Sequence, residues 1–344
     1  MSTDPGTDRI TKTITSGTTG TPFTTGISKS ALTVSDAFSW RRTRWAGYRD
    51  GQWIARLVGD PVIPLRLSNP EKPWRISWTD KRIYLSTFHL NIDMASCYLD
   101  VLERMQPDYL MGYPSSLEIL AAFLMELGRE ITWSPKEIFF SSETLYSHQE
   151  ELIKKAFGAP LRGFYGSAER IISASQCDKR NYHLGLLDGY AEGQFGIITA
   201  HNPALSTTLV NKVMPLIRFP IGDWIKFRPD IECPCGRTLP LIDPVVTKHE
   251  DWVVTPSGRR ISSSIITFAF KDLAGVRRSQ VVQVSKYCVV VFLDATELHY
   301  DKAAKIVSRR LYDMFFGELS IRCVRNNNIK ISMAGKTQFV VRQV

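Results

Sequence analysis

Residues 15–22, reading TSGTTGTP, are the first stretch of the chain whose composition suggests chemistry. Most of these residues are glycine, serine or threonine, so backbone N–H groups and hydroxyls can approach an acidic ligand without bulky side chains in the way. A phosphate is the expected ligand. No lysine follows Gly20, which excludes the Walker A pattern of P-loop NTPases. From composition alone, a Ser/Thr/Gly linker remains the alternative.

Two cysteine-containing stretches form the second candidate site. The sequence QCDKRNYHL holds Cys177 and His183, and ECPCGR holds Cys233 and Cys235. Three thiolates and one imidazole are a closed, structural zinc set if the two stretches meet in the fold. The C-x-C spacing is tighter than the usual C-x-x-C. The alternative is that these four residues are buried or loop residues that bind no metal.

The composition is that of a soluble globular protein with more than one domain. The chain has 344 residues, of which 44% are hydrophobic and 22% charged. No apolar run reaches the ~18 residues of a membrane span, and the N-terminal residues have no signal-peptide core. The net charge of +9 comes from dispersed arginine pairs rather than one basic tract. We expect a cytoplasmic protein that binds anionic small molecules such as nucleotides, and neither nucleic acid nor membrane.

The first half of the chain alternates helical and strand patterns. Within residues 28–48, Ser35 and Asp36 are possible caps and the aromatic residues have helical spacing, which predicts a helix that carries Phe38, Trp45 and Tyr48. The aromatic side chains of this helix are expected mostly in the core.

The segment that follows predicts an α/β arrangement. Two amphipathic helices flank a short strand at 109–111 and a turn at 112–115. EIFFSSETL then reads as a buried strand with a polar turn, SHQEELIKKAFG as a helix ending at Gly158, and PLRGFYGSAE as a strand with a glycine turn. Turns at the carboxyl edge of such a sheet are the usual ligand sites of α/β proteins.

The second half has a different organisation. Short β-rich segments follow Gly196, and the final segment predicts strand, strand, helix, strand and a loop with Gly335 and Lys336. This small α+β unit is large enough to be a domain. We place the boundary near Thr247, which divides the chain into residues 1–247 and 248–344.

Six motifs in order resemble the adenylate-forming superfamily of acyl-CoA synthetases and adenylation domains. They are TSGTTGTP, SSETL, FYGSAE, PLIRFPIGD, CPCGRTLPLI and AGKTQFV. The pattern is most similar to phenylacetate–CoA ligases and related capsule-biosynthesis ligases. The resemblance implies a layered α/β core with a β-rich subdomain and a small mobile α+β C-terminal domain. It also implies that a carboxylic acid and ATP give acyl-AMP and pyrophosphate, after which a thiol such as that of coenzyme A attacks.

The resemblance also implies which residues bind the nucleotide. Tyr165 would lie against adenine, Glu169 would hold Mg²⁺ and Asp223 would accept both ribose hydroxyls. The structural alternatives are core packing for Tyr165, a charge at a helix N-terminus for Glu169 and a Gly-Asp turn for Asp223. The remaining nucleotide residues are Thr15, Ser16, Thr18 and Thr19 at the β- and γ-phosphates, and Ser142, Glu143 and Thr144 along the purine edge.

The C-terminal residues implied by the resemblance depart partly from the family pattern. Lys336 would bridge the substrate carboxylate and the α-phosphate, as a catalytic point charge. Where relatives carry Gly-Arg before a conserved hinge acid, this sequence has Thr247 and Lys248, which puts ribose or phosphate recognition by Lys248 and the hinge in doubt. Similar cysteines in related ligases favour zinc at the Cys/His stretches.

For the acid, the family segments YLSTFHLN and GYPSSL suggest a pocket with aromatic walls suited to an aryl or arylacetic acid. The pocket residues would be Phe88, His89, Tyr113 and Pro114. The acceptor is CoA or, alternatively, an amine. A non-catalytic descendant that binds nucleotide or a partner is a further alternative.

The start of the sequence suggests an association. Relatives place a helical segment before the phosphate loop, whereas about a dozen residues precede it here. We therefore expect a homodimer or a partner chain covering an apolar face, with Trp40, Trp45 and Trp53 as candidate anchors.

Overall fold

The computed structural model describes the chain except residues 1–9, 15–23, 61, 65–66, 68–69, 91, 168, 187, 194–201, 229–230, 246–251, 271–272, 274 and 327–338. The helices are α1 (Lys29–Trp45), η1 (Thr87–His89), α2 (Ile92–Met105), α3 (Pro114–Glu126), α4 (Ser147–Phe157), α5 (Ser263–Ile266), η3 (Thr267–Phe270) and α6 (Glu297–Met314).

The strands belong to five sheets. Their bounds are β1 (Ile10–Ile14), β2 (Thr24–Ser28), β3 (Ile54–Leu57), β4 (Trp74–Ser77), β5 (Arg82–Leu85), β6 (Tyr109–Gly112), β7 (Glu137–Ser141), β8 (Leu161–Gly166), β9 (Ser173–Gln176), β10 (Tyr182–Leu184), β11 (Gly189–Gly193), β12 (Asn202–Thr208), β13 (Phe219–Ile225), β14 (Phe227–Arg228), β15 (Leu241–Ile242), β16 (Trp252–Val254), β17 (Arg260–Ser262), β18 (Val276–Ser285), β19 (Cys288–Ala295), β20 (Ser320–Arg325) and β21 (Val340–Arg342).

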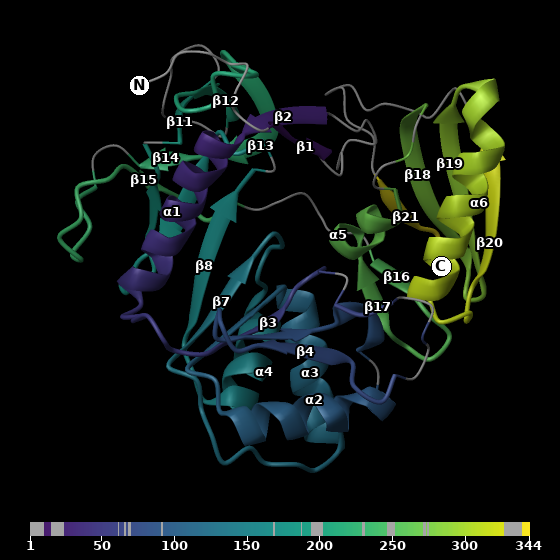
Figure 1. Cartoon of the computed structure of the whole chain (residues 1–344), viewed down its shortest axis with the longest axis horizontal. Helices are drawn as coiled ribbons and strands as arrows, with labels where there is room; N and C mark the ends of the chain where they lie inside the picture. Colours follow the sequence, from purple (N-terminus) through teal and green to yellow (C-terminus); the bar gives the residue numbers. More distant parts are fainter. Residues whose placement is uncertain are drawn as a thin grey trace.

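A ten-stranded sheet forms the centre of the molecule, in the order β14-β15-β10-β9-β8-β7-β6-β3-β5-β4. Strands β8, β7, β6, β3 and β5 run parallel, and the outer strands pair antiparallel. Helices α2, α3 and α4 cover one face, and α1 lies beside β8 (Figure 1). The predicted α/β fold class is confirmed.

Local sequence explains most of these elements. Pro114 stands in the first turn of α3, where its missing N–H costs no hydrogen bond. Gly158 ends α4 with φ of 65°, a left-handed conformation that glycine adopts without strain. The helices and strands predicted between residues 92 and 166 are confirmed as α2, β6, α3, β7, α4 and β8.

Helix α1 begins earlier than its sequence suggested. Its cap is Ser28, whose hydroxyl accepts a hydrogen bond from the Ala31 N–H. The expected caps at Ser35 and Asp36 were wrong, because Ser35 is buried on the inward face of the helix. Tyr48 lies beyond the helix end and is buried, as expected for a core aromatic.

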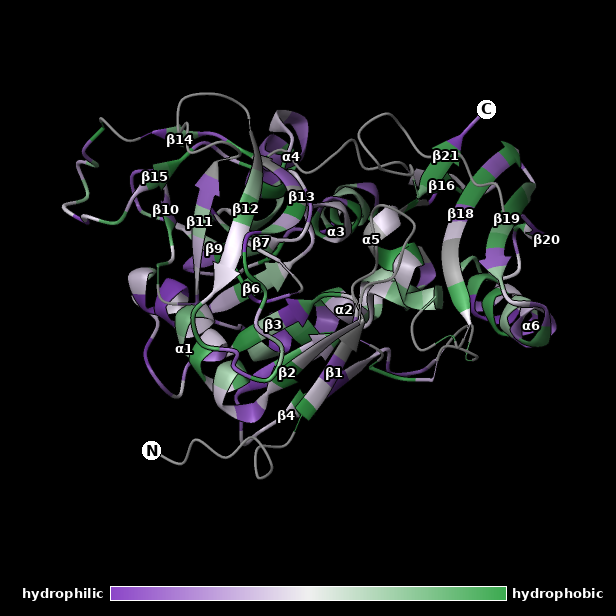
Figure 2. Ribbon diagram, turned by 90° about the horizontal axis from the view of Figure 1, so that it is seen from above, coloured by the Kyte–Doolittle hydropathy of each residue, from purple (hydrophilic) through white to green (hydrophobic). Residues whose placement is uncertain are grey.

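The C-terminal part forms a second layered unit. The sheet order is β20-β19-β18-β21, and α6 packs on it (Figure 2). The observed order of strand, strand, helix and strand matches the prediction from sequence. Its core also takes in Phe88 from the first half of the chain. The predicted boundary at Thr247 lies outside the described residues, so the division into 1–247 and 248–344 stays a prediction.

Two smaller sheets complete the first half. β11, β12 and β13 form an antiparallel sheet, which agrees with the predicted β-rich segment, and β1 pairs with β2. Within the part of the chain that is described, every helix is too short or too polar to cross a membrane.

The association predicted from the sequence remains a prediction. Of its three candidate anchors, the Trp40 side chain is 41% exposed, whereas Trp45 and Trp53 are half-buried. Trp45 packs against His183, and Trp53 packs against Trp78.

Candidate functional site

The fold brings together two of the residues expected to bind the adenosine. Tyr165 lies near the end of β8, and Asp223 lies on β13, 58 positions later in the chain. The Tyr165 hydroxyl donates a hydrogen bond of 2.8 Å to Asp223 Oδ2. Tyr165 is 8% exposed, so burial raises the pKa of its hydroxyl, and the Asp223 charge raises it further. The phenol therefore stays protonated and orients the carboxylate.

Glu169 follows in the turn after β8. This turn is closed by hydrogen bonds from the Ser167 N–H to the Ile172 carbonyl and from the Arg170 N–H to the Ser167 carbonyl. Burial raises the pKa of the Glu169 carboxyl, and the charge of Asp223 also raises it. The two carboxylates therefore repel one another, and a cation between or beside them would reduce this repulsion.

The turn after β7 holds the residues expected along the purine edge. Ser142 has φ of 71°, which bends the chain sharply after the strand. Glu143 is buried, and its two oxygens accept hydrogen bonds of 2.9 Å from the backbone N–H and the hydroxyl of Ser115. Because Ser115 lies in the first turn of α3, the carboxylate also faces the positive end of that helix. This structural role of Glu143 was not foreseen, and the purine role of Ser142, Glu143 and Thr144 stays a prediction.

The residues expected around the acid lie near the first turn of α3 and in η1. Phe88 and His89 are buried in η1, and Tyr113 and Pro114 are at the start of α3. His89 Nδ1 is 2.7 Å from the Ser86 hydroxyl, and its ring packs edge-on against Phe316. Burial lowers the pKa of His89, so the imidazole is neutral near pH 7.

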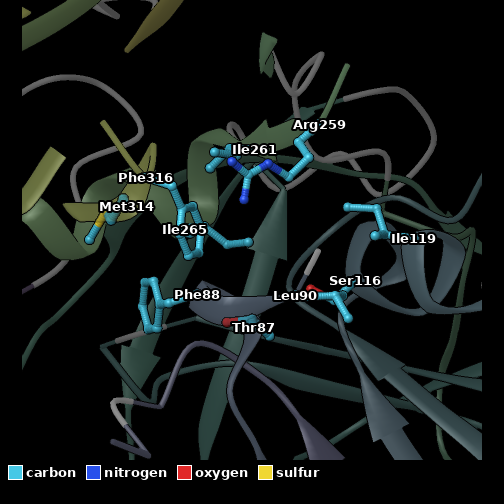
Figure 3. Close-up of a pocket in the computed structure, with 10 residues that line it drawn as sticks. All are labelled: Thr87, Phe88, Leu90, Ser116, Ile119, Arg259, Ile261, Ile265, Met314 and Phe316. Carbon is cyan, nitrogen blue, oxygen red and sulfur yellow. The ribbon is translucent and has the colours of Figure 1, made fainter. Parts of the chain in front are cut away.

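A pocket that is partly open to solvent lies where η1 and α3 meet the C-terminal unit (Figure 3). Of the expected acid-binding residues only Phe88 lines it. The lining residues are Thr87, Phe88, Leu90, Ser116, Ile119, Arg259, Ile261, Ile265, Met314 and Phe316. The pocket is therefore mainly apolar, with a single cationic side chain.

Arg259 is that cation, and the sequence did not single it out. Figure 3 shows its side chain reaching toward Ile261 over the pocket, with Thr87 and Phe88 on the opposite wall. The guanidinium lies 4.2 Å from the Phe316 ring and pairs with Glu318. Its Nη1 is buried without a hydrogen-bond partner, and burial lowers the pKa of the group. Its position after a Gly in a Ser-Gly-Arg turn was the only signal in the sequence.

The four candidate metal ligands do meet. The ligand atoms of Cys177, His183, Cys233 and Cys235 all lie within 4.8 Å of one another. Cys177 Sγ and Cys233 Sγ are 3.6 Å apart, close to the ~3.8 Å between two sulfurs that share a tetrahedral zinc. Cys235 Sγ is 3.3 Å from His183 Nε2, and Cys177, Cys233 and Cys235 are free cysteines. The donor set therefore fits a structural zinc ion.

The pKa shifts of His183 and Cys235 favour the forms that ligate a metal, whereas burial raises the pKa of Cys177 to about 11. The Leu239 carbonyl lies 3.3 Å from His183 Nδ1, which leaves Nε2 to face the cysteines. Burial lowers the pKa of His183, so the ring is neutral. Burial alone would raise the pKa of Cys235, but hydrogen bonds from the Arg237 backbone and side chain bring it down to about 7.

Six other predicted residues lie outside the described residues. They are Thr15, Ser16, Thr18 and Thr19 of the phosphate loop, Lys248 and Lys336. Their roles stay predictions.

The fold is that of adenylate-forming ligases. The chain is similar to 2-hydroxyisobutyryl-CoA ligase in complex with 2-HIB-AMP and CoA in the thioesterification state, at a TM-score of 0.57 and 19% identity over 99% of this chain and 75% of that one. It is also similar to the amide bond synthetase McbA from Marinactinospora thermotolerans, at a TM-score of 0.50 and 16% identity over 95% of this chain and 67% of McbA.

A relative by sequence is protein CapK of Staphylococcus aureus. The two are 21% identical over 303 residues, which cover 87% of this chain and 66% of CapK. This chain thus spans just under two thirds of the length of CapK. No protein-family model matches the sequence.

Proposed function

We propose that this protein activates a carboxylic acid with ATP, forming an acyl-AMP and releasing pyrophosphate. The observation that supports this best is the hydrogen bond between Tyr165 and Asp223, with Glu169 in the turn that follows Tyr165. The fold of the chain is also that of adenylate-forming ligases. These are three of the residues that the family motifs match, and they come from two distant segments. Their clustering is expected of a nucleotide site.

Each residue has a physical role in the proposed reaction. The Asp223 carboxylate accepts from the ribose hydroxyls, and Tyr165 presents its ring to adenine while holding Asp223 in place. Glu169 binds Mg²⁺, which neutralises the triphosphate charge. Thr15, Ser16, Thr18 and Thr19 donate to the β- and γ-phosphates, and Lys336 approaches the reacting carboxylate and α-phosphate.

The proposed acid is aryl or arylacetic. The pocket beside Phe88 is lined mainly by apolar side chains, which suits an apolar acid. His89 adjoins Phe88 in η1, Tyr113 packs against the core cluster that contains Phe88, and Pro114 begins α3 beside Tyr113. Neutral His89 is a positioning residue in this proposal, because a carboxylate nucleophile needs no base near neutral pH.

Two acceptors are compatible with the fold. The structure of 2-hydroxyisobutyryl-CoA ligase contains CoA, whereas McbA is an amide bond synthetase. We propose transfer to CoA as the first function to test and transfer to an amine as the second. The donor set of Cys177, His183, Cys233 and Cys235 is proposed to hold a structural zinc ion outside the reaction.

Acid-dependent exchange of labelled pyrophosphate into ATP tests the proposal directly. We expect exchange with an aromatic acid and Mg²⁺, and a loss of about 100-fold or more in Lys336→Ala and Asp223→Asn. Lys305→Ala, on the exposed side of α6, is the matched control and should keep full exchange. Absence of exchange with every aromatic, aliphatic and sugar-derived acid, in protein that still binds ATP, would support the non-catalytic alternative instead.

A further inference from the structure

Arg42 is a buried cation that the proposed reaction does not use. It lies on the inward face of α1 and is 8% exposed. Its guanidinium carbon is 4.2 Å from the centre of the Phe164 ring on β8, and Nη2 is 3.9 Å from the sulfur of Met111 on β6. Its Nε and Nη1 are buried and have no hydrogen-bond partner among the described residues. An aromatic face and a thioether cannot replace the water that these N–H groups lose.

Two more arginines flank this guanidinium. Arg56 on β3 is the register partner of Met111 on β6, so both side chains lie on the same face of the sheet as Arg42. Arg170 bonds to Ser35, which is seven residues before Arg42 and therefore on the same side of α1. Arg56 also has a buried Nε without a partner.

Within the part of the chain that the structure describes, the acids around this cluster pair with the other two arginines and form no ion pair with Arg42. Asp60 pairs with Arg56 at 3.3 Å, and Asp36 pairs with Arg170 at 3.1 Å. Both carboxylates are therefore paired with the flanking arginines, and neither is paired with the guanidinium of Arg42. Glu143 lies near Arg56 across Tyr113, but its oxygens accept hydrogen bonds from Ser115.

This arrangement is unfavourable unless an anion joins it. Burial, together with the smaller effects of the Arg56 and Arg170 charges, lowers the pKa of Arg42 to about 10. The group is therefore still a cation near pH 7, and an unpaired buried charge destabilises a fold by several kcal/mol. A guanidinium fork with two open N–H groups matches the two oxygens of a carboxylate or a phosphate.

We propose that Arg42, flanked by Arg56 and Arg170, binds a small oxyanion, a carboxylate or phosphate group, between α1 and the sheet. The site is separate from Tyr165 and Asp223 and does not depend on the proposed adenylation. Its ligand stabilises α1 against β6 and β8 and thereby the segment that leads from the phosphate loop into the core. Occupation of the site would couple anion concentration to the stability of this helix.

Thermal unfolding of the full chain at constant ionic strength tests the site with two probes, inorganic phosphate and benzoate, each against chloride. We expect the wild-type Tm to rise with at least one of them, and the two series identify which oxyanion binds. Arg42→Met should raise the Tm in chloride, because it removes the unpaired charge, and should abolish the rise with the anion. Arg44→Met is the matched control, since Arg44 lies two residues away on the exposed side and pairs with Asp50.

Calorimetric titration of the wild type with the same anions provides a test that does not need Arg42→Met to fold. Arg170→Met, at a half-exposed site, should weaken binding about tenfold or more, whereas Arg44→Met should leave it unchanged. Asp223→Asn should lose ATP binding and keep anion binding, which separates this site from the nucleotide site. A wild-type Tm and calorimetric signal that are independent of both anions would overturn the proposal, as would equal binding by Arg42→Met.

Discussion

Removal of one ligand from the cysteine–histidine group should lower thermal stability well beyond the effect of an ordinary cysteine substitution. Cys177 and Cys233 are 56 positions apart, so a metal bound to both closes a long loop. Closing a loop of that length in the unfolded chain corresponds to roughly 4 kcal/mol in the chain-entropy model. The pairing of β10 with β15 already holds the two segments together in the folded protein.

The expected loss for Cys235→Ala is therefore about 2–4 kcal/mol, which for a protein of this size corresponds to a fall in Tm of roughly 3–6 °C. Differential scanning calorimetry measures it, and elemental analysis of protein purified without chelator should find one zinc per chain. Cys288→Ala is the control, because Cys288 starts β19 and is not part of the group. ATP affinity should be the same in both variants.

Two results would refute this reasoning. Protein without zinc would show that the four side chains meet for packing alone. A Tm for Cys235→Ala equal to that of Cys288→Ala, in protein that does contain zinc, would show that the metal does not link the two segments.

Two further predictions concern stability. The buried pair of Arg162 and Glu137, joined at 2.6 Å through Arg162 Nε, predicts that Arg162→Met costs about 3–5 kcal/mol in urea unfolding. Replacing Glu137 by Leu in the same chain should recover most of this, and an equally unstable double variant would contradict the argument. Burial lowers the pKa of His89 in the folded protein, so protonation of this side chain favours the unfolded state. The free energy of unfolding should therefore fall as the pH drops below ~6.5, by at most ~1.4 kcal/mol per pH unit. His89→Asn should flatten this slope, and identical slopes in both proteins would mean that another group is responsible.

Much of the fold is readable from local sequence. Pro114 and Gly158 mark the ends of α3 and α4, and the apolar strands Tyr109–Gly112 and Glu137–Ser141 lie where their residue types predict. The order of elements in the C-terminal unit was also predictable. These features depend on backbone conformation and side-chain type within a few residues, which a single sequence contains.

The start of α1 was misplaced because several Ser and Asp residues near it are equally good caps by type. Ser28 was selected by the structure around it, since its backbone N–H also bonds to Asn211, 183 positions away. Which polar residue caps a helix is then decided by the partner that packs against it.

The chemistry of the sites divides in the same way. Sequence motifs by themselves determined which residue types can bind nucleotide or metal, and they named Tyr165, Asp223 and the four metal-ligand candidates. Only the tertiary structure decided that Tyr165 and Asp223 share a hydrogen bond and that Arg42 and Arg259 have buried N–H groups without partners. The physical reason is that hydrogen bonding and desolvation depend on the distance between atoms that are far apart in the chain, and that distance is set by how the whole sheet and its helices pack.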